Sequence, residues 1–447
     1  MDKKTISIEY HVEKHMQKQY IRIPFEMPEN VEQMDLSYTY EGMDANSAPL
    51  GEKNVIDLAI ISSDGVDVGA TGSSYKSISI SETFSSPGYK RCKLSCGTWY
   101  ILLGAYLLKS NGTLVHYDIT FHFKSLRPYK GDPHVHSINS DGKLSYQELA
   151  HQARKRKLDF IILTDHNFTP QDALPSYSDL TIIPGVELTN YSGHINYWGV
   201  TQPYTGSYAA NSFDEFLKLN EEAGGAGAVR VVNHPSCSFC PWKWDLNFPL
   251  EGMEIWNGPM RQDNLNAIKL WDSELRKGRR LFPTGGADFH SMPLLLFAKP
   301  TTTVYAMSRS PSDILEGFLK GQVTMGATHK TPRLLISSGN IIAGGEVKLT
   351  NDTIATITCA KLKRKQTLII YDQSGEIYRK KATQTAFFET SIHVTKPGFV
   401  RAEVRFKKNP ISALLYRLFQ KITHAPDIKN PLPLFVCSAT SAIFFTD

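Results

Sequence analysis

Between residues 127 and 330, short apolar runs alternate with segments of helical period, and this alternation constrains the fold more than any other feature. The runs DFIIL, LTIIPGVEL, AVRVVN and EGMEIWN are interspersed with helix patterns such as LSYQELAHQARKRKL and FDEFLKLNEEAGGAG. Ser145 and Glu148 predict a capping box at the start of the first helix. Repeated alternation of strands and helices predicts a parallel α/β architecture of the barrel type. In such barrels, functional side chains collect at the C-terminal ends of the strands.

The segments on either side of this region have a different pattern. Residues 1–126 contain strand-like runs such as TWYILLGAYLL and VHYDITFHF, separated by the turn signals SSDG, SSPG and SNG. Residues 331–447 return to β patterning, for example in QTLIIYD and GFVRAEVRF. A chain of 447 residues is too long for one ordinary domain. We therefore predict three domains: an N-terminal β-sandwich-like domain (1–126), an α/β domain (127–330) and a C-terminal β-sandwich-like domain (331–447).

One amphipathic segment interrupts the C-terminal β pattern. The run ISALLYRLFQKI predicts a short helix at 411–422, and basic residues lie in and beside it: Lys407, Lys408, Arg417 and Lys421. A basic amphipathic helix can lie on a membrane or bind a partner. Packing of its apolar face against its own domain is the more common arrangement, and we favour it here.

Charge and hydropathy exclude several classes of protein. The net charge of +5 mildly favours anionic partners, but no basic cluster is dense enough to indicate nucleic-acid binding. The first residues, MDKKTISIEYHVEK, lack the apolar core of a signal peptide. No run reaches the roughly 18 consecutive apolar residues that span a bilayer. We expect a cytoplasmic enzyme with a small-molecule substrate, and the sequence leaves its oligomeric state open.

The cysteines do not indicate a disulfide framework or a structural zinc site. Six cysteines in a long chain fit a reducing compartment. Cys92 and Cys96 form one close pair, and Cys237 and Cys240 form another, but neither has a second pair at zinc-site spacing. Ordinary thiols are the favoured interpretation, although Cys237 lies close enough to His234 to border a pocket.

Histidines and carboxylates recur where the predicted strands end. In GDPHVHSINSDG, His134 and His136 point to one face of an extended segment, because side chains alternate with period two. Imidazole and carboxylate together suit zinc, iron or manganese, and one carboxylate can bridge two cations. The residues at or just past predicted strand ends are Asp165, His166, Glu187, His234, Asp288 and His290, while His194 begins a strand. The set predicts a metal centre.

These motifs together resemble the PHP (polymerase and histidinol phosphatase) superfamily of metallohydrolases, and within it the CehA/McbA-like family. The resemblance is carried by GD-x-H-x-H with SDG and by LDFIILTDHN, PGVELT, SGHINYWG, VVNHPS, EIWNG and GADFH. It extends to SPGYK and GTWYILLGAY in the first domain, so that it covers about three-quarters of the chain. It implies a distorted seven-stranded barrel with two or three divalent ions (Mn, Zn or Fe).

The resemblance also implies ligand roles. His134, His136 and Asp288 would hold a first metal, which Glu187 would bridge to a second metal held by His194 and His234. Asp141, His166 and His290 would hold a third. Many relatives have His where Asp141 stands, so the sequence leaves open whether two or three metals bind. Asp132 and Asp165 would orient the histidines.

Three hypotheses for the function follow. The first is a phosphoesterase that acts on a small phosphate ester or nucleotide. The second is a carboxylester, carbamate or amide hydrolase with the same metal site, and the third is a catalytically idle metal-binding module. The complete ligand set argues against the third. Candidates for proton transfer are His194, His290 and Asp141, and candidates for binding an anionic substrate are Arg230, Arg261, Asn167 and Asn257. For Arg230, a salt bridge beside its strand is at least as good an explanation.

Overall fold

The computed structural model describes residues 2–43, 53–73, 75–170, 174–291, 294–406 and 435–447. The chain divides into two compact units, Met1–Leu126 with Ser176–Ser178, and Arg127–Pro175 with Asp179–Asp447. The helix predicted at 411–422 lies outside the described residues. Among the helices that the structure describes, none has the length and apolar character needed to cross a membrane.

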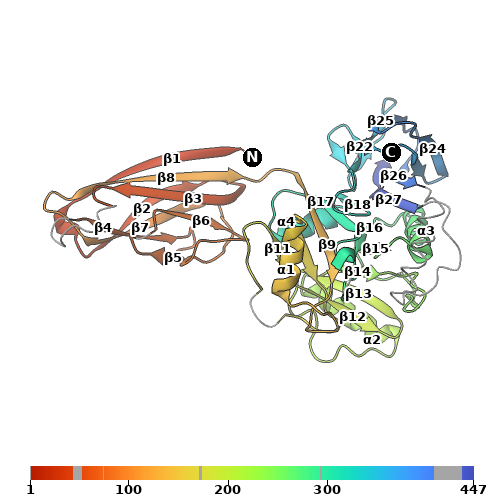
Figure 1. The fold of residues 1–447 in the computed structure, drawn as a ribbon, viewed down its shortest axis with the longest axis horizontal. Helices are drawn as coiled ribbons and strands as arrows, with labels where there is room; N and C mark the ends of the chain where they lie inside the picture. Colours follow the sequence, from red (N-terminus) through yellow and green to blue (C-terminus); the bar gives the residue numbers. More distant parts are fainter. Residues whose placement is uncertain (1, 44–52, 74, 171–173, 292–293, 407–434) are drawn as a thin grey trace. The chain divides into compact units, whose positions relative to one another are not determined.

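The first unit is built from two antiparallel four-stranded sheets (Figure 1). One has the order β1 (Lys3–Val12), β8 (Thr113–Phe123), β3 (Val31–Tyr40) and β6 (Ser77–Ser81). The other has the order β2 (Tyr20–Met27), β7 (Gly97–Leu107), β4 (Val55–Ile61) and β5 (Asp67–Thr71). In β8, Val115, Tyr117, Ile119 and Phe121 are fully buried and alternate with more exposed residues. This period of two gives each strand one face for the shared core.

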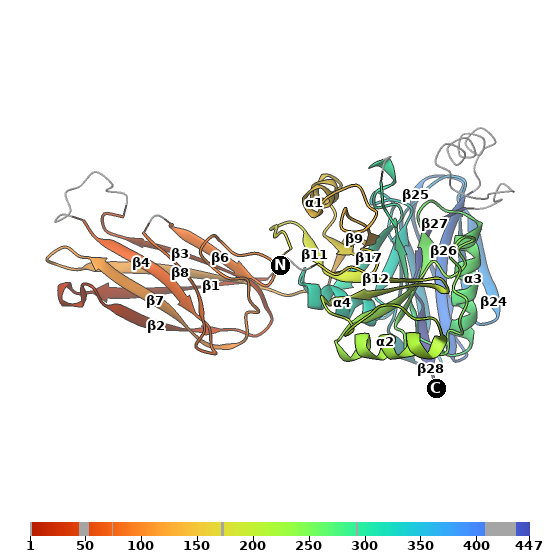
Figure 2. The ribbon, with the colours of Figure 1, turned by 90° about the horizontal axis from the view of Figure 1, so that it is seen from below.

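The second unit contains two open sheets that carry the predicted site residues. The larger has the order β11 (Thr181–Ile183), β10 (Phe160–Leu163), β9 (Arg127–Val135), β17 (Thr301–Ala306), β18 (Val323–Gly326), β27 (Phe435–Thr440), β26 (Gly398–Phe406), β23 (Gln366–Asp372) and β24 (Gly375–Lys381), with β21 (Glu346–Lys348) and β28 (Ile443–Thr446) attached at β26. The smaller has the order β12 (Gly185–Asn190), β13 (Gly193–Trp198), β14 (Val229–Asn233), β15 (Gly252–Asn257) and β16 (Phe282–Gly286). Figure 2 shows the same unit from below.

The fold is mixed α/β and rich in strands, but a closed seven-stranded barrel is not seen among the described residues. In the described part of the chain, the two ends of the smaller sheet reach β9 and the segment after β10 only through the isolated bridges Val135–Phe289 and His166–Glu187. β13 runs antiparallel to both of its neighbours, and β18 pairs with β27, so that C-terminal strands continue the larger sheet.

The C-terminal residues therefore share a sheet with the central strands, and the predicted three-domain division stays a prediction. A further sheet has the order β20 (Ile341–Ile342), β19 (Leu334–Ser338), β22 (Ile354–Leu362) and β25 (Ala386–His393). Its buried side chains pack with those of β23 and β26 in one core.

Helices connect several of these strands and begin at well-defined caps. They are α1 (Tyr146–Lys155), α2 (Phe213–Gly225), α3 (Gln262–Arg276) and α4 (Pro311–Leu319), with short 3-10 turns at Lys14–Met16 and Leu294–Leu296. The capping box of α1 is confirmed: the Ser145 side chain accepts from the Glu148 backbone, and the Glu148 carboxylate accepts from the Ser145 backbone.

The core beside β9 depends on Phe160, which is fully buried on β10. Its ring lies edge-on to Phe318 at 6.0 Å, and it packs against Gly131, where a Cβ atom would come within 2.5 Å of the ring. We expect Phe160→Ala to lower the free energy of unfolding by about 3–5 kcal/mol, because it removes buried surface and leaves a cavity. Urea unfolding of the full chain measures this, with Phe387→Ala as the control.

Phe387 is 63% exposed, and its truncation is expected to change the unfolding free energy by less than about 0.5 kcal/mol. Equal effects of the two substitutions would contradict the packing described for Phe160.

Candidate metal centre

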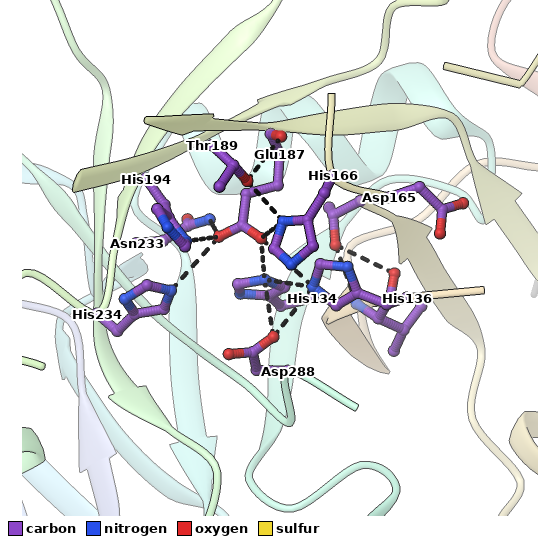
Figure 3. Close-up of polar contacts among 12 residues, drawn as sticks. His134, His136, Asp165, His166, Glu187, Thr189, His194, Asn233, His234 and Asp288 are labelled. Carbon is purple, nitrogen blue, oxygen red and sulfur yellow. Dashed lines mark hydrogen bonds and ion pairs between the residues drawn. The ribbon is translucent and has the colours of Figure 1, made fainter. Parts of the chain in front are cut away.

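Six histidines and three carboxylates, from strands and the loops that follow them, form overlapping groups of candidate ligands. Figure 3 shows His134, His136, His166, Glu187, His194, His234 and Asp288. Glu187 lies on β12, and His194 lies on β13 directly opposite Thr189. Because β13 is antiparallel to β12, its first residues lie beside the end of β12, which explains how a strand-initial histidine reaches the others. The remaining members lie at the end of β9 or in the loops after β9, β10, β14 and β16: His134, His136, Asp141, His166, His234, Asp288 and His290.

The first group consists of His134, His136, Glu187 and Asp288. Nε2 of His134 lies 3.2 Å from Nε2 of His136. Glu187 Oε2 lies 3.5 Å and 3.4 Å from these two nitrogens, and Asp288 Oδ1 lies 3.4 Å and 3.0 Å from them. Four atoms that surround a zinc-like ion at 2.0–2.1 Å in a tetrahedron are about 3.3 Å apart. The distances between these four atoms therefore fit a tetrahedrally coordinated cation.

Two carboxylate oxygens of the same group that lack a hydrogen-bond partner among the described residues also indicate a cation site. Glu187 Oε2 and Asp288 Oδ1 are buried, and neither accepts a hydrogen bond within the described structure. The two facing imidazole nitrogens and the two carboxylate oxygens are four atoms that can each donate an electron pair to a metal ion. A divalent cation satisfies all four atoms at once.

A second set of contacts surrounds the other oxygen of Glu187. Nδ1 of His194 lies 3.1 Å from Oε1, and Nε2 of His234 lies 3.4 Å from it. The Asn233 side chain donates a hydrogen bond to the same oxygen at 2.7 Å. Glu187 thus has one oxygen toward each pair of histidines.

The third group contains Asp141, which is the most exposed of the candidate ligands. Asp141 Oδ1 lies 3.2 Å from Nε2 of His290 and 3.7 Å from Nε2 of His166, and these two nitrogens are 3.4 Å apart. The Asp141 side chain is 60% exposed, whereas that of His136, which joins the same group, is fully buried. The structure therefore brings Asp141 to the centre as a carboxylate open to solvent.

The charges in the cluster shift the pKa values of its members in opposite directions. Burial lowers the pKa of His134, but the carboxylates of Asp288, Glu254 and Glu187 raise it well above its ordinary value. Burial raises the pKa of Glu187 and Asp288, yet the surrounding imidazoles hold both well below their ordinary range. For His136, burial prevails and the pKa is lowered. The metal-free centre is thus a set of anionic carboxylates that attracts protons and cations.

Glu254 was missed by the analysis of the sequence. It is 2% exposed on β15, and its Oε1 accepts a hydrogen bond from Nδ1 of His134 at 3.1 Å. Its Oε2 accepts from the backbone of His234 and from the side chain of Asn257. A carboxylate on the second ring nitrogen fixes the orientation of a ligating histidine. The available signal was an acidic residue inside the otherwise apolar strand GMEIWN.

Asp132 and Asp165 brace the backbone around the histidines rather than their rings. Asp132 accepts from the backbone of His134, Ala287 and Ala298, and burial raises its pKa to about 7. Asp165 accepts from the backbone and hydroxyl of Ser137, and also from Ser140 and Tyr146. These two carboxylates fix the loops that carry the candidate ligands.

Of the two arginines predicted to bind substrate, the structure brings one to the centre. Arg230 lies away from it: its guanidinium donates to both oxygens of Glu251, at 3.1 Å and 2.5 Å, and lies beside Gly224 of α2. These contacts favour the salt-bridge explanation for Arg230, and its role in substrate binding stays a prediction. Arg261 donates to Asn257 Oδ1 at 3.0 Å, and Asn257 in turn donates to Asp288 Oδ2 at 3.2 Å. Arg261 is therefore linked to the first group through one side chain.

Asn167 has a structural role. Its side chain donates to the Thr189 carbonyl at 3.2 Å and accepts from the Thr189 backbone N–H at 2.9 Å. Both ends of the amide are thus engaged with β12, beside the bridge between His166 and Glu187. These bonds hold the His166 loop against β12, and they leave the Asn167 amide little freedom to bind substrate.

No protein-family model and no curated protein matches this sequence. Solved structures that resemble the chain include PHP-like metal-dependent phosphoesterases. A two-domain protein from Bacteroides vulgatus, containing a predicted PHP-like metal-dependent phosphoesterase, is 19% identical over 62% of this chain and 90% of its own, with a TM-score of 0.39. An amidohydrolase from Chromobacterium violaceum is 16% identical over 43% and 96%, with a TM-score of 0.26. A structure described as a metal-dependent phosphoesterase from Bifidobacterium adolescentis is 15% identical over 36% and 87%, with a TM-score of 0.24. All three TM-scores lie below 0.5, so these likenesses assign the chain to no family.

The contact between Glu254 and His134 generates the first prediction for the centre. We expect Glu254→Gln to weaken metal binding by about 10- to 100-fold, because the amide no longer fixes the tautomer and ring orientation of His134. Competition with a coloured chelator measures the affinity. Glu251→Gln is the matched control, since Glu251 pairs with Arg230 outside the cluster. Equal affinities of the two variants would count against the role of Glu254.

The raised pKa of His134 generates the second prediction. A ligating imidazole must be neutral, so a metal ion that binds at neutral pH has to displace the proton that the neighbouring carboxylates hold on His134. Metal affinity is therefore expected to fall as the pH is lowered through neutrality. Calorimetric titration at pH 7 in two buffers of different ionisation enthalpy is expected to give different apparent heats. Identical heats would mean that no proton is released.

Proposed function

We propose that this protein is a metal-dependent hydrolase, and that its preferred reaction is the hydrolysis of a small phosphate ester or nucleotide. The observation that carries the proposal is the first group, in which the four facing atoms of His134, His136, Glu187 and Asp288 have tetrahedral spacing. We assign a first ion to these residues. A second would lie with His194 and His234, and a third with Asp141, His166 and His290.

Divalent ions at such a site supply a Lewis acid, which makes water a nucleophile at neutral pH and polarises a phosphoryl or carbonyl oxygen. The residues of the chain position the ligands and supply the negative charge around them. Glu187 and Asp288 are held ionised by their histidines, and Glu254 and Asp132 fix the geometry of His134. This arrangement is in place before substrate binds, so little reorganisation is needed during the reaction.

The more exposed members of the cluster are the ones suited to handle protons. The side chains of His194, His290 and Asp141 are 14%, 29% and 60% exposed, so each can exchange protons with solvent. We propose that one of these three residues, where it does not bind a metal ion, protonates the leaving group. His134, His136 and Glu187 are buried too deeply for that role.

The position of Arg261 supports a phosphate ester as the substrate. Its guanidinium reaches Asn257, which contacts Asp288, so a cation lies one side chain away from the first group. A guanidinium at that distance can bind an anionic phosphoryl oxygen. Arg230 pairs with Glu251, so only one of the two predicted arginines lies near the centre. A carboxylester, carbamate or amide substrate is therefore the alternative that the assay must include.

The test combines metal analysis with a hydrolysis panel. His134→Ala with His136→Ala is expected to remove the first ion and to lower hydrolysis of phosphate esters at least 100-fold, because it deletes two of its four ligands. Phosphate monoesters and diesters, aryl esters, carbamates and amides are assayed with added manganese, zinc or iron. His151→Ala, at an exposed position in the same unit, is the control. Unchanged metal content and hydrolysis in the double variant would refute the proposal.

A further inference from the structure

The loop after β14 brings a cysteine to the second histidine pair. The Cys237 backbone donates to the His234 carbonyl at 2.8 Å, and the Trp242 backbone donates to the Pro235 carbonyl at 3.0 Å. Farther along, the Lys243 backbone donates to the Ser192 carbonyl at 2.8 Å, just before β13 begins. The loop is therefore tied both to the segment that carries His234 and to the residue before the strand that carries His194.

Cys240, on this loop, belongs to one candidate ligand group with both histidines. His194, His234 and Cys240 each offer one ligand atom, and these three atoms lie within 4.8 Å of one another. The Cys240 Sγ atom is 3.7 Å from Nδ1 of His234. A tetrahedral ion with a metal–nitrogen distance of 2.0–2.1 Å and a metal–sulfur distance of 2.3 Å places the two ligand atoms about 3.6 Å apart. The observed separation matches that spacing.

The other nitrogens of the two rings are already directed at Glu187. Nδ1 of His194 and Nε2 of His234 lie 3.1 Å and 3.4 Å from Oε1 (Figure 3). A neutral imidazole has one N–H donor and one lone pair. If these two nitrogens donate to the Glu187 carboxylate, the lone pairs remain on Nε2 of His194 and on Nδ1 of His234. A carboxylate behind a ligating histidine is a common arrangement in metal sites.

We propose that Cys240 is a thiolate ligand and that, with His194 and His234, it forms a nitrogen–sulfur metal site at the second position of the centre. In this arrangement Glu187 orients both histidines through Oε1 while Oε2 faces the first group. Binding breaks the S–H bond of Cys240, releases its proton to solvent and forms a metal–sulfur bond, with no change of oxidation state. The inference rests on the proposed metal centre and adds a ligand to it.

The sulfur ligand has a consequence for metal identity. Thiolate is a soft ligand that suits zinc or iron, whereas manganese and magnesium prefer oxygen ligands. The first group has two nitrogens and two oxygens, so the two positions are expected to differ in preference. We therefore expect the second position to favour zinc or ferrous iron over manganese.

Cobalt(II) provides a probe that reports the ligand directly. The reduced, metal-free full-length protein is titrated with cobalt(II), and absorption is recorded in the visible and near-ultraviolet. Visible d–d bands report cobalt in a protein site, and an intense near-ultraviolet charge-transfer band reports a cobalt–thiolate bond. We expect both bands in the wild-type protein, and loss of the near-ultraviolet band in Cys240→Ser.

Cys237→Ser is the matched control. Cys237 Sγ lies 3.2 Å from Cys240 Sγ in the same loop, but Cys237 belongs to none of the candidate ligand groups among the described residues. This variant is expected to keep the near-ultraviolet band. Zinc analysis after dialysis gives a second readout, in which Cys240→Ser loses about one ion more than Cys237→Ser. Far-ultraviolet circular dichroism establishes that both variants are folded.

The outcomes separate this inference from the proposed function. Visible cobalt bands without a near-ultraviolet band in the wild-type protein would leave the metal centre standing and overturn the role of Cys240. A near-ultraviolet band that survives in Cys240→Ser would overturn it too, and would make Cys240 a residue that positions the His234 ring through its contact with Nδ1. Absence of every cobalt band would defeat the metal centre itself.

Discussion

The buried carboxylate of Glu187 is the interaction on which the rest of the centre depends. It is inaccessible to solvent, and an ionised carboxylate in that position is costly unless cations or strong donors surround it. Contacts from four elements supply them. His134 approaches Oε2, His194 and the Asn233 amide approach Oε1, and His166 approaches Oε2 at 2.9 Å. The centre is thus organised around one negative charge, which contacts five of the six histidines: His134, His136, His166, His194 and His234.

The arrangement of strands explains why these side chains can converge. β9 and β10 run parallel and end at the same edge of the larger sheet, where His136 and His166 follow them. In the smaller sheet, the β12–β13 hairpin returns the chain so that His194 lies opposite Thr189 near Glu187. Two glycines permit the close packing that this requires. A Cβ atom at Gly286 would come within 2.3 Å of the His134 side chain, and one at Gly142 would come within 2.5 Å of the His136 carbonyl.

The sequence motifs predicted the candidate ligands better than they predicted the residues that hold those ligands in place. The nine residues named as candidate ligands lie together. They could be predicted because they stand at alternate positions of a strand or at strand ends, and both signals can be read from the sequence. Glu254, which holds His134, could not be recognised in this way, because a buried acid within an apolar strand has no distinctive spacing. Arg230 was indistinguishable from Arg261 in the sequence, since only the fold determines which guanidinium meets Glu251.

The sequence by itself determined the strand-rich α/β character, the capping box of α1 and the identity of the histidines and carboxylates that meet, because local periodicity and side-chain chemistry are written into short segments. The tertiary structure alone decided how the sheets are joined and which neighbours each side chain has. It continues the larger sheet into the C-terminal strands, since β18 pairs with β27 more than a hundred residues away in the chain. It also places Cys240 beside His234 and Glu254 behind His134. Such contacts depend on the register and direction of distant strands, which no local pattern specifies.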